Sequence, residues 1–179
     1  MAFHGTSTPE PPDWPRPPDD LAATVGGLPV SPGHKPETGM AHDWPLASFL
    51  ELSAHPEAVR SARSHVRQVL SDWELDYRRE HVALVISELA TNAVRASRAL
   101  TETTPVRLWL FSDKDKILIM VWDASPCPVS PPRAGEELGE NGRGLLLVDA
   151  ISTRWSWYYT AETAGKVVWS LCSGTEPST

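Results

Sequence analysis

The chain has 179 residues, with 23 acidic and 16 basic side chains and a formal net charge of −7. This charge argues against a nucleic-acid-binding protein, because no basic excess exists to contact phosphates. No apolar run approaches the roughly 18 residues that a membrane helix needs. The N-terminus lacks the pattern of a secretory signal. Two cysteines are too few for a disulfide framework or a structural zinc site. We therefore expect a cytoplasmic protein without membrane or direct nucleic-acid contacts.

The composition changes sharply near residue 45. Residues 1–45 hold ten of the 17 prolines and five of the 11 glycines. Such a stretch buries too little apolar surface to offset its ordering entropy. We predict a disordered Pro-rich N-terminal arm over 1–45, a folded domain over 46–173 and a flexible tail over 174–179.

The first half of the domain predicts a strand and two helices. Residues 46–52 alternate apolar and polar side chains, as in a half-buried strand. Pro56 suits the first turn of a helix that runs to about Trp73. Asp76 is a good N-cap for a second helix ending near Ala99. The apolar stripe of this second helix comprises Val82, Val85, Ile86, Leu89, Ala93 and Val94.

After Pro105 the apolar period changes from 3.6 to 2. The pattern predicts strands over 106–111 and 117–123, a loop over 124–141, a helix over 142–150, and strands over 155–159 and 166–172. The loop is too long for a simple connector, and loops of this length are often functional. The element order predicts an α/β fold, a two-layer α/β sandwich with helices on one face of a mixed, mostly antiparallel sheet.

Glu88 and Asn92 lie four residues apart on the second predicted helix, so they project from one side of it. A carboxylate and a carboxamide oxygen on a rigid helix can hold Mg²⁺ and orient a hydroxyl group. The alternative is a solvated polar edge.

Asp123 ends a strand that is otherwise apolar. Its oxygens could accept a hydrogen bond from the amino group of an adenine. The alternative is a strand-terminating aspartate in an Asx turn, which Ser125 and Pro126 favour.

The segment Asn141-Gly-Arg-Gly-Leu145 leads into an apolar helix. Its glycines let the backbone approach a ligand, the helix N-terminus offers unpaired amides to phosphate oxygens, and Arg143 could contact a terminal phosphate. The alternative is an ordinary glycine-rich loop end.

Together, in this order, the three segments resemble the nucleotide-binding (GHKL or Bergerat) fold of gyrase-type ATPases, Hsp90, histidine kinases and MutL. ISELATNAV resembles its N box, VWDASPCP its first glycine box and NGRGLLLVDAIS its second. The segments SELATNAV, GRGLLLVDAIS and GKVVW are most similar to the compact anti-sigma-factor serine/threonine kinases. The resemblance spans about residues 46–172.

The resemblance implies a role for each matched residue. Glu88 is the expected catalytic residue and would polarise the attacking hydroxyl, while Asn92 would coordinate Mg²⁺ and Asp123 would bind the adenine amino group. Residues 124–141 would form the ATP lid. The full set of expected ATP-binding residues is Asn92, Asp123, Ser125, Gly142, Arg143, Gly144 and Leu145.

The activity expected from the resemblance is transfer of the γ-phosphate of Mg-ATP to a serine or threonine of a small antagonist protein, with a sigma factor as a further partner. Only one helix of about 18 residues precedes the N box, which argues against a complete histidine kinase. The alternatives are a non-catalytic nucleotide-dependent binding module and an ATPase.

Several aromatic residues alternate on the predicted strands, among them Trp109, Phe111, Trp155, Trp157 and Tyr159. On an open sheet face they would form an apolar patch of the kind that marks a partner surface. The alternative is that these aromatic residues fill the core. We expect a homodimer or another protein contact.

Overall fold

The computed structural model describes residues 44–129, 140–160 and 165–173. Residues 1–43 of the predicted arm, the predicted tail and residues 130–139 of the predicted lid lie outside this part of the chain. The elements are β1 (Leu46–Leu52), α1 (Glu57–Asp72), the 3-10 turn η2 (Asp76–Arg78), α2 (Arg79–Arg98), β2 (Val106–Ser112), β3 (Lys116–Asp123), α3 (Glu140–Ile151), β4 (Arg154–Tyr159) and β5 (Lys166–Ser173). Among the described residues, no helix has the length and apolar character needed to cross a membrane.

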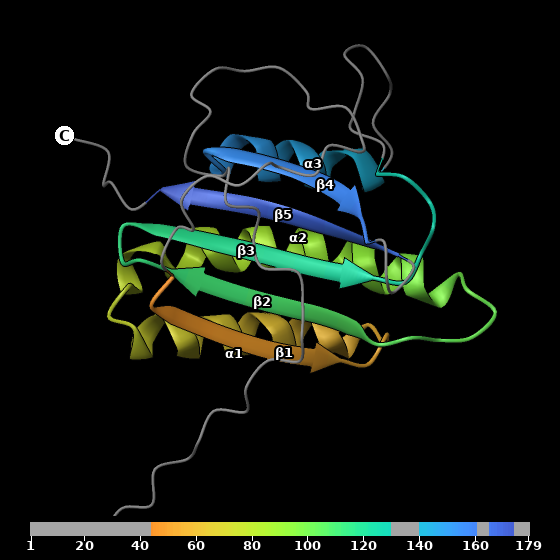
Figure 1. The fold of residues 1–179 in the computed structure, drawn as a ribbon, viewed down its shortest axis with the longest axis horizontal. Helices are drawn as coiled ribbons and strands as arrows, with labels where there is room; N and C mark the ends of the chain where they lie inside the picture. The colour runs from red at the N-terminus through yellow and green to blue at the C-terminus, as the bar shows by residue number, and fades with distance from the viewer. Residues whose placement is uncertain (1–43, 130–139, 161–164, 174–179) are drawn as a thin grey trace, which may run out of the picture. The chain divides into compact units, whose positions relative to one another are not determined.

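The strands form one five-stranded sheet in the order β1-β2-β3-β5-β4. Every neighbouring pair in that order is antiparallel. The helices lie behind the sheet in Figure 1, and α2 packs against β3 as well as against α1 and α3. The predicted two-layer α/β sandwich is therefore confirmed, but the sheet of the described residues is antiparallel throughout and not mixed.

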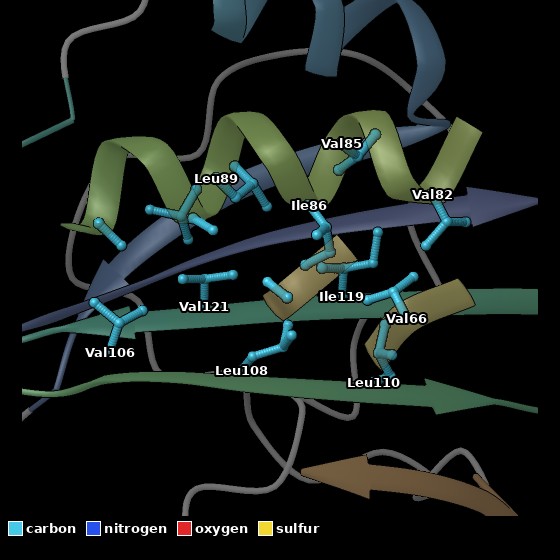
Figure 2. Close-up of a cluster of buried hydrophobic side chains, with 14 of the residues drawn as sticks. Val66, Val82, Val85, Ile86, Leu89, Val106, Leu108, Leu110, Ile119 and Val121 are labelled. Carbon is cyan, nitrogen blue, oxygen red and sulfur yellow. The ribbon is translucent and has the colours of Figure 1, made fainter. Parts of the chain in front are cut away.

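Helix α2 forms the centre of the core because its apolar stripe faces the sheet. Figure 2 shows side chains of α2 directed at those of β2 and β3, such as Ile86 above Ile119. Removing these side chains from water is the main stabilising contribution, at about 1.5–3 kcal/mol for each large one. All six residues of the predicted stripe are buried, namely Val82, Val85, Ile86, Leu89, Ala93 and Val94.

The predicted N-cap role of Asp76 is wrong. Asp76 begins the turn η2 instead, and α2 starts only after Arg78, which makes no side-chain capping bond. The cause lies just upstream, where Glu74 takes a positive φ of 61° and reverses the chain. Leu75, the next residue, is buried, and the 3-10 turn follows it before the regular helix begins. Asp76 instead forms an ion pair with Arg79 at 2.9 Å.

The aromatic residues of the strands divide between the two sheet faces. Trp155 and Trp157 pack against the core on the helix side. Trp109 faces the other side, where the strand register aligns it with Met120 and Trp169, and it is only 4% exposed. Tyr159, in contrast, is 47% exposed, and the predicted homodimer or other protein contact stays a prediction.

Candidate functional site

Asp123 lies where three elements meet. Strand β3 ends with this residue, and β5 and α3 begin at the same end of the sheet (Figure 1). The following segment contains Pro126 and Pro128, which cannot donate to a strand ladder, so the strand stops there. The chain thus delivers a single carboxylate to the end of an apolar strand, where Asp123 is 1% exposed.

The Asp123 carboxylate has two donors, and both reach the same oxygen. The Ser125 amide donates to Oδ1 at 2.9 Å, which is the Asx turn considered from the sequence. The Lys166 ammonium donates to Oδ1 at 2.8 Å. Ser125 is also buried, and its hydroxyl accepts a bond from the Cys127 amide at 3.2 Å. The turn therefore fixes the carboxylate without occupying Oδ2.

The electrostatics of Asp123 are a balance of burial against its donors. Burial raises the pKa of this carboxyl, because the charged form loses water. The hydrogen bond and charge of Lys166 act in the opposite direction, and the Ser125 amide adds to them. On balance the pKa of the Asp123 carboxyl is raised, and its Oδ1 atom accepts both hydrogen bonds at a position that is 1% exposed.

Sequence reasoning missed Lys166. The signal was available, because this lysine begins a mostly apolar strand, as Asp123 ends one. The register pairs the two residues directly. Gly165 makes this pairing possible: its φ is +114°, and a Cβ there would meet the Asp123 carbonyl oxygen and come within 2.8 Å of the Ala124 Cα. Only glycine fits this close approach.

Glu88 and Asn92 lie on α2 and are half-buried, at the edge of its apolar stripe. Glu88 directly faces α3, because a Cβ on Gly144 would meet the Glu88 Oε2 atom. The glycine therefore leaves the space that the carboxylate occupies. The structure thus brings the predicted N box and the predicted second glycine box into contact at Glu88.

Helix α3 begins at Glu140, two residues earlier than the sequence predicts. Glycine lowers helix propensity without stopping a helix that packs well, and α3 packs on α2. Gly142 and Arg143 consequently lie within the first turn, where amides lack internal partners. The surroundings of these two residues are outside the described part. Leu145 is buried and anchors this turn in the core.

The structure also bears on the predicted magnesium ion. Within the described residues, no group of three or more His, Cys, Asp or Glu side chains could hold a metal by itself. Mg²⁺ in nucleotide sites is commonly held by one or two protein oxygens together with phosphates and water. The side-chain oxygen of Asn92 fits that pattern, and its role stays a prediction.

Comparison with known families decides the class of the domain. The family model of the histidine kinase-like ATPase domain matches residues 52–170. The chain belongs to this family. The match runs from the end of β1 into β5 and includes both the Glu88–Gly144 contact and the Asp123 site. No curated protein matches the chain.

Membership makes this an ATP-binding domain of the histidine kinase-like class. The GHKL resemblance seen in the sequence is therefore confirmed at the level of the superfamily. The roles predicted for individual residues, and the kind of phosphoryl acceptor, stay predictions.

Proposed function

We propose that the domain is a serine/threonine protein kinase of the anti-sigma-factor type. It transfers the γ-phosphate of Mg-ATP to a hydroxyl of a small antagonist protein and so controls transcription through a partner switch, with a sigma factor as a second partner. The observation that carries the proposal is the contact of Glu88 with Gly144, because it sets a carboxylate beside the helix turn that is expected to receive the phosphates.

The chemistry follows from the placement of these groups. Phosphoryl transfer requires mainly positioning and neutralisation of charge. Glu88 accepts the proton of the substrate hydroxyl while the hydroxyl oxygen forms a bond to the γ-phosphorus. The bond between the γ-phosphorus and the β–γ bridging oxygen breaks, and ADP leaves. The first turn of α3 supplies amides to the phosphates, and the positive end of the helix dipole favours their charge. The side-chain oxygen of Asn92 would hold the Mg²⁺, which would neutralise part of the phosphate charge.

The decisive experiment incubates the protein with γ-labelled ATP and candidate antagonist proteins. We expect label on a serine or threonine of one antagonist. Nucleotide binding without any transfer would support the non-catalytic binding module instead, and release of free phosphate that no partner suppresses would support an ATPase.

Replacing Asn92 by alanine should abolish Mg²⁺-dependent ATP binding while the fold is kept, because the side chain is half-buried and outside the apolar stripe. Titration with a fluorescent ATP analogue, with and without Mg²⁺, measures this loss. Thr91→Ala is the matched control, since the Thr91 hydroxyl already donates to the Ser87 carbonyl at 2.6 Å. Unchanged affinity in Asn92→Ala would remove the residue from the site.

Replacing Gly144 by alanine should slow phosphoryl transfer with little loss of stability. The new Cβ must displace the Glu88 carboxylate, which is the free end of a side chain and can move away. Alanine also favours a helix interior by about 0.5–1 kcal/mol over glycine. Transfer rates and urea unfolding measure the two effects. A variant with the full wild-type rate would show that the position of Glu88 does not matter.

A further inference from the structure

The ion pair between Lys166 and Asp123 is unusual because both side chains are buried, with exposures of 6% and 2%. Removing two charges from water is costly, and an apolar pair of similar volume often stabilises a fold at least as well. An ion pair of this kind at the edge of a proposed ligand site therefore calls for a reason beyond stability.

The hydrogen-bonding capacity of the pair is only partly used. A lysine ammonium has three N–H donors. One donates to Asp123 Oδ1 at 2.8 Å and a second reaches the Ser125 carbonyl at 3.5 Å, a marginal distance. No third acceptor lies among the described residues. On the carboxylate, both donors are bound to Oδ1, and no donor from the described residues reaches Oδ2.

Among the described residues, the pair thus leaves one lysine donor and the acceptor Oδ2 without a protein partner, next to each other. Buried polar groups are normally satisfied, so a matching ligand edge is expected to complete them. Adenine offers such an edge: its amino group is a donor, and a ring nitrogen beside it is an acceptor.

We infer that Lys166 is a nucleobase-reading residue of the ATP site. It donates to the ring nitrogen beside the adenine amino group, N1 or N7, while Asp123 Oδ2 accepts from the amino group. The inference rests on the proposed function in so far as ATP is the ligand. It adds a second base contact to the single carboxylate predicted from the sequence and makes adenine recognition depend on a charge-assisted bond.

The first experiment uses the wild-type chain and compares ATP with 1-deaza-ATP and 7-deaza-ATP by calorimetric titration. Each analogue lacks one ring nitrogen and keeps the amino group. We expect one of the two to bind about tenfold or more weakly than ATP, the loss of one charge-assisted hydrogen bond. GTP is a poorer probe, because guanine also carries a donor next to an acceptor.

The second experiment assigns the effect to Lys166. In Lys166→Met the sensitive analogue should bind as well as ATP, because the donor is gone. If that variant does not fold, the double variant Asp123→Asn/Lys166→Met removes both charges, and the ratio of its affinities for ATP and the sensitive analogue should be one. Lys116→Met is the matched control, since Lys116 lies at the opposite end of the same strand pair, facing Ser173. Lys116→Met should bind the sensitive analogue more weakly than ATP, as the wild type does.

The outcomes separate this inference from the proposed function. Equal binding of ATP and both analogues to the wild type would overturn the role of Lys166 and leave ATP binding intact. The role of Lys166 would also be overturned if the sensitive analogue still bound more weakly than ATP to the Lys166→Met variants. Failure of the wild type to bind ATP at all would instead refute the proposed function.

Discussion

Asp123→Asn is expected to be among the most destabilising single substitutions in the domain. The asparagine can still accept the Ser125 amide, but it no longer neutralises the Lys166 ammonium, which stays 6% exposed with no carboxylate partner. Removing one partner of a buried ion pair typically costs about 3–5 kcal/mol. Urea unfolding should show a loss of that size, together with much weaker binding of ATP.

The double variant Asp123→Asn/Lys166→Met separates burial of charge from loss of shape. It removes both charges at once, so it should recover most of the stability that the single variant loses. The recovery would show a coupling between the two residues, as expected for groups 2.8 Å apart. A single variant within about 1 kcal/mol of the wild type would contradict the buried ion pair, since such a pair costs more when broken.

Glu88→Gln should have the largest effect on catalysis. Glutamine keeps the size of the side chain that faces Gly144 and removes its ability to accept a proton. Loss of a general base typically lowers a rate by about 10²–10⁴-fold. We expect that decrease in transfer from γ-labelled ATP, with ATP affinity and urea stability close to those of the wild type.

Glu80→Gln is the matched control for this substitution. Glu80 lies on the same helix, is exposed, and forms an ion pair with Arg67 at 2.8 Å. An exposed pair of this kind contributes little, so the variant should keep its activity. Equal rates for Glu88→Gln and wild type would show that Glu88 is not the base.

The fold was largely predictable because the hydrophobic pattern specifies it. The apolar stripe of α2 has the period of a helix. Strands β2 and β3 are short, mostly apolar segments that the structure buries almost throughout. The start of α2 was not predictable in the same way. A capping signal at Asp76 is a local preference, and the burial of Leu75 overrides it.

The candidate site was predictable only in part, because motifs name residues within single segments. Glu88, Asn92 and Asp123 each stand out from their own element, and Gly144 from the segment before its helix. Lys166 does not, because its importance arises from the strand register that places it opposite Asp123. The register depends on how two distant segments pair, and a motif within either one does not contain it.

The most direct test is a crystal structure of the full chain with Mg²⁺ and a non-hydrolysable ATP analogue. We expect the adenine amino group on Asp123, with Lys166 on the neighbouring ring nitrogen, and the phosphates at the first turn of α3 beside Glu88 and Asn92. A nucleotide bound elsewhere, or one whose base lies away from Asp123, would contradict this account of the site.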